Sequence, residues 1–296
     1  MRKVKKWWIP WLFLTPALVI LGTFVLYPMF FGSVLAFFDF SLLSYDEGGS
    51  LLPPRWVGLA NFRRLFSDIY FIKAMQNSIL YVLVVPILQA IAIFLAWLLN
   101  EDTSFSKLSR TALYIPVVTS MVVVGIVWKW LLRTDGLLNQ IIAFVSFDKV
   151  APIPWLTDTK IAIFSVMLVT MWQGIGYYLI LYLAGLQAIP KEIEEQAQID
   201  GAQSWQIFRK IILPLLKPTI AVCSLLSLIS ALKVFTEIYI ITGGGPQNST
   251  LTSSFYIYQN AFENFDMGYA ASMALVLAAV IGVATLGQRF MFAEKA

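Results

Sequence analysis

The chain has 296 residues, of which 59% are hydrophobic and only 13% are charged. In soluble globular domains about a quarter of the residues are charged, so this composition excludes an ordinary soluble protein and predicts an integral membrane protein. The formal net charge of +4 is small and its basic residues are dispersed, which favours contacts with membrane lipid and gives no support for nucleic acid as a partner.

Several chemistries are excluded by residue types that are rare or missing. The sequence has no histidine and a single cysteine, Cys223, so histidine-based metal sites, catalytic triads and an intramolecular disulfide are all excluded. The glycine-rich stretch Gly243–Thr250 lacks the lysine of a Walker A motif. We therefore predict no catalytic residue, no metal site and no bound cofactor. Any ATP-driven step must belong to another polypeptide.

The N-terminal residues 1–8 place four positive charges before an apolar run that reaches Phe38. The run is too long for a signal-peptide core and has no small-x-small cleavage site, so we predict a retained first membrane helix. The N-terminal charges favour a cytoplasmic N-terminus. Basic residues elsewhere support this orientation only modestly, because the first outer loop also contains several.

Further apolar runs are each near or above the ~20 residues that cross a bilayer. An even number of spans brings the C-terminus back to the cytoplasm. No internal repeat or low-complexity linker divides the chain, so we treat residues 1–296 as one transmembrane domain. Its six predicted spans are about 9–38, 76–99, 111–132, 160–188, 214–242 and 268–290.

Two outer segments separate the first four spans. Residues 39–72 are predicted to form a polar loop that ends in a surface helix, because Leu59, Phe62, Phe66 and Ile69 recur at helical spacing. The segment 133–160 is predicted to be irregular with a short helix near 137–146. The pattern does not distinguish a solvated connector from a contact with an outside partner.

The middle of the fourth span is unusually aromatic and rich in hydrogen-bonding groups, and Gly174 and Gly176 permit close approach there. The residues are Trp172, Gln173, Tyr177, Tyr178 and Tyr182. Flat apolar rings combined with fixed polar groups are typical of sugar sites. Packing between helices is the commoner role for such residues. Both interpretations stay open.

A charged loop, residues 190–213, lies between the fourth and fifth spans. Pro190 is a helix start signal, and Asp200-Gly201 predicts a left-handed residue that closes the first helix. Ser204 is predicted to cap a second helix, which Pro214 stops. Trp205, Phe208 and Ile212 share one face of that helix. Spacing alone fits an amphipathic helix on the membrane surface better than a docking element.

The fifth span contains Ser227, Ser230, Lys233 and Glu237 at intervals of three, three and four residues. On one continuous helix they form a polar sector in which Lys233 and Glu237 make an ion pair one turn apart. Such a sector faces either a translocation pathway or another subunit. The candidate pathway residues are Trp172, Gln173, Tyr177, Ser230, Lys233 and Glu237.

The charged loop also permits an identification. The spacing Glu195-Gln196-Ala197, Gly201 and Ile211-Ile212-Leu213-Pro214 resembles the Glu-Ala-Ala loop of permease subunits in binding-protein-dependent ABC importers, although Gln196 stands where the pattern usually has Ala. Other stretches look like the sugar-permease branch typified by the maltose transporter: Arg110–Pro116, Gly125–Trp128, Gly136–Asn139, Ala184–Pro190 and Ile238–Pro246.

The resemblance implies an all-α permease in the cytoplasmic (inner) membrane, with six transmembrane helices and a cytoplasmic coupling helix between the fourth and fifth. It implies a second homologous permease, two ATPase subunits that bind ATP and Mg, an external solute-binding protein, and a sugar or related polyol as substrate. Phe235-Thr236-Glu237 departs from the family's Phe-Thr-Asp, which leaves solute contact there open. The implied coupling residues are Glu194, Glu195, Ala197, Asp200, Gly201, Ala202, Trp205, Phe208, Leu213 and Pro214.

Three other functions remain open. An ion-coupled secondary transporter can use Lys233 and Glu237 for coupling. A membrane enzyme is disfavoured by the absence of histidine and of a recognisable catalytic constellation. A scaffold without transport predicts partner binding but no ATP hydrolysis stimulated by solute.

Overall fold

Long apolar helices dominate the computed structural model, which describes residues 8–45 and 52–292. Within these residues, four helices can cross a membrane by length and composition: Trp11–Leu35, Ile69–Leu98, Ala162–Gln187 and Met267–Phe292. Two bent pairs raise the number to six if each counts as one span: Ser104–Val118 with Met121–Leu131, and Ser204–Leu215 with Lys217–Leu232. The prediction of an all-α membrane protein is confirmed.

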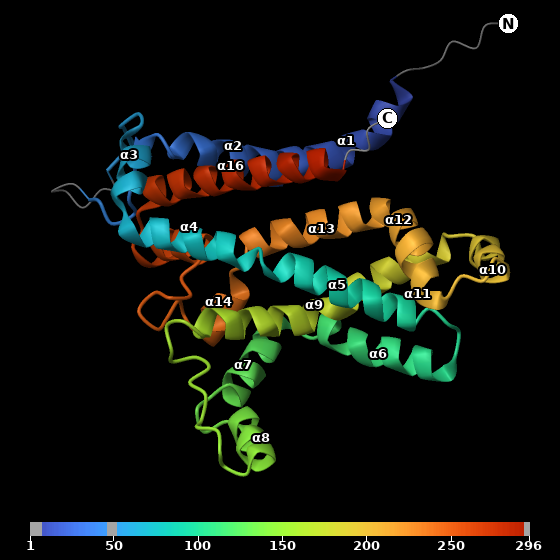
Figure 1. Cartoon of the computed structure of the whole chain (residues 1–296). Coiled ribbons are helices and arrows are strands. Elements are labelled where there is room, and N and C mark those ends of the chain that lie inside the picture. Colours follow the sequence, from blue (N-terminus) through green and yellow to red (C-terminus); the bar gives the residue numbers. More distant parts are fainter. Residues whose placement is uncertain (1–7, 46–51, 293–296) are drawn as a thin grey trace, which may run out of the picture. The chain divides into compact units, whose positions relative to one another are not determined.

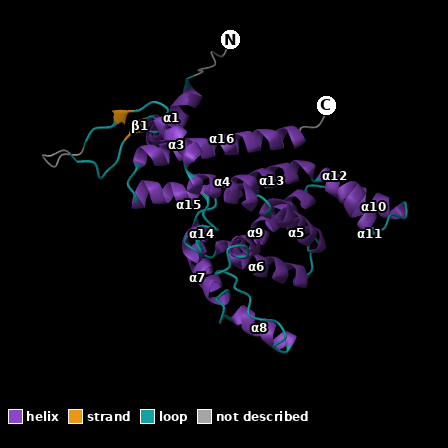
Figure 2. Ribbon diagram, turned by 60° about the vertical axis from the view of Figure 1, so that its left-hand side comes forward, coloured by secondary structure: helices purple, strands orange, loops and turns teal. Residues whose placement is uncertain are grey.

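The chain divides into two compact units. The described part of the first comprises residues up to Asp68 together with Ile257–Val276, and the second comprises Ile69–Tyr256 together with residues 277–292. Helices account for most of both units, as the colouring by secondary structure makes plain (Figure 2).

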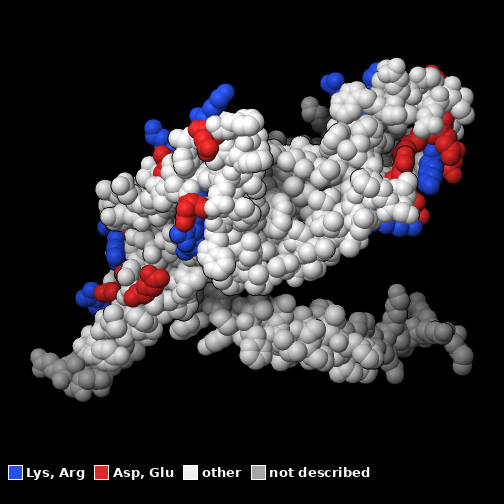
Figure 3. Space-filling view, turned by 90° about the horizontal axis from the view of Figure 1, so that it is seen from below, with Lys and Arg blue, Asp and Glu red and all other residues white. Residues whose placement is uncertain are grey.

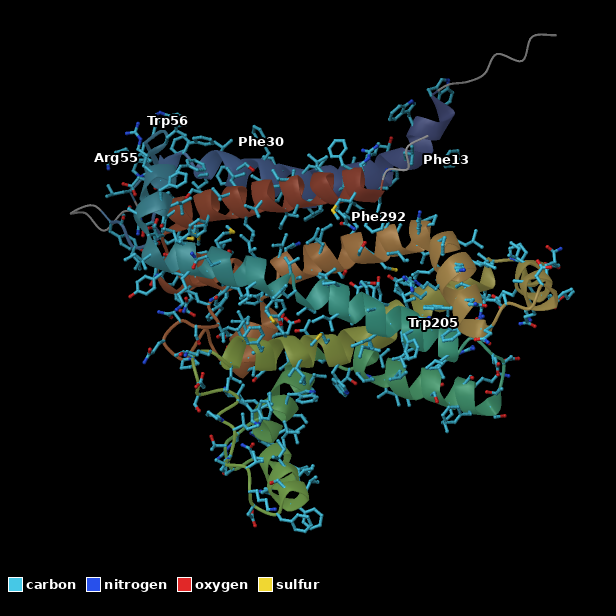
Figure 4. All side chains as sticks on the ribbon, viewed as in Figure 1. Phe13, Phe30, Arg55, Trp56, Trp205 and Phe292 are labelled. Carbon is cyan, nitrogen blue, oxygen red and sulfur yellow. The ribbon has the colours of Figure 1, made fainter. Side chains whose placement is uncertain are left out.

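The first unit starts with a continuous helical stretch formed by α1 (Ile9–Leu21), η1 (Gly22–Leu26) and α2 (Tyr27–Leu35). Side chains such as Phe13 and Phe30 project from it and are 79% and 69% exposed (Figure 4). A helix that is apolar on all sides requires lipid or another protein around it. The stretch therefore has the properties of a membrane span.

The loop that follows α2 in the first unit is held by contacts between residues far apart in the sequence. Strands β1 (Phe38–Asp39) and β2 (Arg55–Trp56) pair antiparallel, a feature that the sequence pattern did not predict. Helix α3 (Ala60–Ser67) follows, close to the predicted surface helix. Its Arg64 makes a 2.7 Å ion pair with Asp266 and lies 3.8 Å above the centre of the Tyr269 ring. These contacts fasten α3 to the start of α16 (Met267–Phe292).

Helix α4 begins earlier than expected. It starts at Ile69, inside the predicted loop 39–72 and ahead of the predicted span 76–99. The polar residues Lys73, Gln76 and Asn77 obscure this start in the sequence. Asn77 is buried because its side-chain amide donates to the carbonyls of Ser249 and Leu251, at 3.1 and 2.8 Å.

The second unit is a bundle around α9 (Ala162–Gln187), which packs against α5 (Val84–Leu98) and α6 (Ser104–Val118). Helix α13 (Lys217–Leu232) packs against α5 and α9 (Figure 1). Gly176 on α9 permits this packing, since a Cβ there would meet the backbone carbonyl of Leu113 on α6. The unit's first helices are α4 (Ile69–Tyr81), α5 (Val84–Leu98), α6 (Ser104–Val118), α7 (Met121–Leu131), α8 (Leu137–Ser146) and α9 (Ala162–Gln187). They are followed by α10 (Lys191–Ile199), α11 (Ser204–Ile207), η2 (Phe208–Ile212), α12 (Leu213–Leu215), α13 (Lys217–Leu232) and α14 (Thr236–Ile241). Helix α15 (Ser253–Tyr258) crosses the boundary between the two units, and η3 (Gln259–Glu263) and the first part of α16 belong to the first unit.

Asn139 organises the segment that was expected to be irregular. Its side-chain nitrogen donates to the carbonyl of Ile153 at 2.9 Å, and its oxygen accepts from the backbone N–H of Ile153 and the indole N–H of Trp155. The short helix predicted near 137–146 is confirmed as α8, and Asn139 ties it to the following loop.

Candidate functional site

The bend in the charged loop is a glycine helix end. Helix α10 stops at Ile199, and Gly201 follows with φ +81°, as the sequence predicted. The N–H of Gly201 donates to the carbonyl of Gln198 at 3.0 Å, and that of Ala202 donates to the carbonyl of Ala197 at 2.9 Å. These two hydrogen bonds form a Schellman motif, the usual glycine-based end of a helix. The motif requires the spacing that separates Ala197, Gly201 and Ala202 in the charged loop.

The second half of the loop differs from the prediction at both ends. Gln203, not Ser204, caps α11 and exchanges hydrogen bonds with Gln206 in a capping box. Pro214 does not stop the helix. The N–H of Leu213 reaches five residues back to the carbonyl of Phe208, so the π turn η2 absorbs the hydrogen bond that Pro214 cannot make. The helical path continues to Leu215 before it bends.

Aromatic rings hold this elbow, residues 191–215, to the end of α5. The centroid of the Phe208 ring lies 4.6 Å from that of the Trp97 ring, and the centroid of the Trp205 ring lies 6.4 Å from that of Trp97. Phe208 is only 7% exposed, whereas Trp205 is 55% exposed. The Phe208 ring therefore packs inside this chain and is not presented to an outside partner, and its implied role in coupling stays a prediction. Trp205 remains accessible.

An open, mostly polar cavity of about 580 Å³ lies beside α10 and the α5–α6 turn. Glu194 and Glu195 line it from α10, opposite Glu101 and Asp102. Arg110 secures the turn by donating to the backbone carbonyls of Leu99 and Glu101. Acidic and basic side chains gather at the right-hand end of Figure 3, where Figure 1 places α10. Asp200 is exposed at the tip, while Leu213 and Pro214 lie where the elbow joins the bundle.

A second cavity, of about 410 Å³, lies inside the bundle. We call it the bundle cavity. Four of the six candidate pathway residues line it, namely Gln173, Tyr177, Ser230 and Glu237. The other lining residues come from α4, α5, α6, α9 and α13 and from the break after α13: Tyr81, Val84, Val85, Leu88, Val117, Thr170, Gly174, Tyr178, Leu226, Ser227, Ile229, Ala231 and Val234.

Trp172 and Lys233 do not line the bundle cavity. The Trp172 ring instead packs edge-on against Trp128 at 5.4 Å. Lys233 is exposed at the end of α13.

The predicted Lys233–Glu237 ion pair is not formed, and that prediction is wrong: the ion pairs found in residues 8–45 and 52–292 all join other groups. Helix α13 ends at Leu232 and α14 begins at Thr236, so the two residues are not one turn apart on a common helix. The break separates Lys233 from the polar groups of the cavity.

Sequence reasoning missed Tyr81 and Thr170, which line the bundle cavity, and Gln89, which contacts the lining residue Ser227. The hydroxyls of Tyr81 and Thr170 lie 2.5 Å apart across α4 and α9. Gln89 donates to the hydroxyl of Ser227 at 2.9 Å and accepts a hydrogen bond from Tyr182, which joins α5, α13 and α9. A signal existed in each case, because a lone polar residue in an apolar span needs an internal partner.

Comparisons with known proteins agree with one another. Residues 89–293 match the family described as binding-protein-dependent transport system inner membrane component. The chain is 36% identical over 290 residues to the lactose transport system permease protein LacF of Rhizobium radiobacter, covering 96% of this chain and 94% of that protein. It is 32% identical over 289 residues to the multiple sugar-binding transport system permease protein MsmF of Streptococcus mutans, covering 97% and 96%.

A solved structure is similar over nearly the whole length. It is the crystal structure of a bacterial ABC transporter involved in the import of the acidic polysaccharide alginate. One of its chains has a TM-score of 0.82 and 25% identity, covering 98% of this chain and 96% of that one.

Proposed function

The chain belongs to the binding-protein-dependent transport system inner membrane components, the permease subunits of ABC importers, and we propose that its bundle cavity forms part of an inward pathway for an oligosaccharide or related polyol. The protein is a multi-pass inner membrane permease of an ATP-driven sugar importer and is not itself an ATPase. A separate subunit hydrolyses ATP.

The observation that carries the proposal is the chemistry of the bundle cavity. Aromatic rings of Tyr81, Tyr177 and Tyr178 lie beside the polar groups of Gln173 and Ser230. Sugars present apolar ring faces and many hydroxyls, so a largely apolar pocket with a few fixed polar groups suits them. Alternating access then requires that this cavity open to one side of the membrane at a time.

The elbow supports a coupling role. Its tip exposes Glu195, Asp200 and Trp205, while Phe208 and Ile212 are buried in the bundle. In this proposal, the ATPase moves the exposed end of the elbow, and the packed end passes that movement to the helices that the elbow joins. We assign the exposed end to the ATPase and the buried end to α5 and α13.

The assembly that we propose contains a second homologous permease, two ATPase subunits that carry ATP and Mg, and an external solute-binding protein. Membership in a binding-protein-dependent family supports the last of these. We place both chain ends and the elbow in the cytoplasm. The six spans, with the two bent pairs counted as one each, then form one permease domain, and this chain itself binds no cofactor.

The test is reconstitution of the complex in liposomes with its natural partners and a panel of solutes. Accumulation of a sugar that requires ATP, together with ATP hydrolysis stimulated by the same sugar, is the expected result. Uptake by this chain alone driven by an ion gradient would favour a secondary transporter instead, although the separation of Lys233 from Glu237 removes the pair which that mechanism would use. Partner binding without stimulated hydrolysis would indicate a scaffold.

A further inference from the structure

We propose that the bundle cavity selects uncharged sugars against anionic ones, with Glu237 as the residue that rejects anionic groups such as uronates. This inference rests on the proposed function and narrows its substrate class.

Glu237 is the acidic residue of the bundle cavity. Among the described residues that line the cavity, it alone has a carboxyl group, and the others are glycine or have aliphatic, aromatic, hydroxyl or amide side chains. No lining residue is a lysine or an arginine. The ion pairs in the described part of the chain involve Arg55, Arg64, Lys107 and Arg133, and none of these lines the cavity. The carboxylate is therefore not neutralised by a neighbouring cation.

The carboxylate of Glu237 is available to a ligand. Within residues 8–45 and 52–292, neither Glu237 nor Ser230 forms a hydrogen bond to another side chain, whereas Ser227 is engaged with Gln89 and the carbonyl of Cys223. The hydroxyls of Tyr81 and Thr170 are engaged with each other. The side chains of Glu237 and Ser230 are therefore available to form hydrogen bonds with a solute in the cavity.

Hydrogen-bond chemistry then separates sugar hydroxyls from sugar carboxylates. A sugar hydroxyl donates a charge-assisted hydrogen bond to the Glu237 carboxylate, and such a bond is stronger than a hydrogen bond between two neutral groups. An ionised carboxylate only accepts, so a uronate offers Glu237 no donor from that group and adds like-charge repulsion. In an apolar cavity this repulsion is screened less than in water. We expect discrimination of about tenfold or more in affinity.

The similar alginate transporter imports an acidic polysaccharide, as its description states. Similar folds carry different sites, so the shared architecture does not determine the charge of the solute. The proposal therefore places the solute of this chain in a different charge class from alginate.

The test compares one ligand in two charge states. The membrane complex, purified with its permease and ATPase partners and without the external binding protein, is titrated calorimetrically with a uronate oligosaccharide and with its methyl ester. The ester removes the charge while keeping the ring and hydroxyls. Tighter binding of the ester by about tenfold is the expected result, and equal affinities would overturn the proposal without any variant.

A variant then locates the effect. Glu237→Gln keeps the side-chain size and removes the charge, so the affinity ratio between ester and acid should fall by about tenfold. Glu263→Gln is the matched control, because it makes the same chemical change at an exposed residue of η3 that does not line the cavity. An unchanged ratio in Glu237→Gln would show that another group discriminates. If neither ligand binds and no sugar stimulates ATP hydrolysis by the wild-type complex, the proposed function itself fails.

Discussion

The side-chain amide of Gln89 donates a 2.9 Å hydrogen bond to the hydroxyl of Ser227, which joins α5 to α13 beside the bundle cavity. The other end of the same amide accepts from the hydroxyl of Tyr182 on α9. One buried side chain thus connects the three helices around which the second unit is built. Hydrogen bonds of this kind hold helices together where the hydrophobic effect contributes little.

The first prediction concerns this network. Tyr182→Phe removes the hydroxyl that pairs with Gln89 and should destabilise the protein by about 0.5–2 kcal/mol. The loss is measured as a lower midpoint of thermal unfolding in detergent. Tyr114→Phe is the control, since within residues 8–45 and 52–292 no hydrogen bond from the Tyr114 hydroxyl is found. Equal midpoints for the two variants would contradict a structural role for the network.

The second prediction concerns the elbow. A Cβ at Gly201 would meet open space, so Gly201→Val acts only through the backbone, whose φ of +81° costs about 1–2 kcal/mol for a residue with a side chain. Membrane insertion should persist while ATP hydrolysis becomes uncoupled from sugar uptake in proteoliposomes. Gly201→Asn is the matched variant, because Asn tolerates this conformation better. Fully coupled transport by the Val variant would count against the coupling role.

The third prediction is that Phe208 and Trp205 have different roles in the elbow. Phe208→Ala empties a buried site against Trp97 and should lower stability by about 3–5 kcal/mol. Trp205→Ala removes a half-exposed ring, so it should change the unfolding midpoint much less and instead weaken binding of the ATPase. Unfolding scans and a titration of the complex with purified ATPase measure the two effects. A Trp205→Ala variant that binds the ATPase normally would remove this residue from the proposed interface.

The fourth prediction tests the packing of α9 on α6. In Gly176→Ala the new Cβ would meet the backbone carbonyl of Leu113, which cannot move aside as a side chain can. We expect a lower unfolding midpoint and a poor yield of folded protein. Gly282→Ala is the control, because a Cβ there meets nothing within 4 Å. Normal stability of the Gly176 variant would show that α9 and α6 can move apart without a loss of stability.

Local rules were enough to predict much of this protein. The start of α10 after Pro190, the left-handed Gly201 and the short helix α8 depend on residues a few positions apart, and each is confirmed. The same holds for the membrane character of the chain, which depends on composition alone.

Contacts between distant residues decided the rest. Phe208 is buried because Trp97, far earlier in the chain, lies against it, and no helical pattern around Phe208 includes that ring. Lys233 and Glu237 were predicted to pair because an unbroken helix was assumed, but α13 ends between Ser230 and Lys233. The sequence by itself determined which segments are apolar helices and where the loop bends, because backbone geometry is local. Only the tertiary structure decided which polar groups meet in the cavity, because side chains from six helices become neighbours only when the bundle packs.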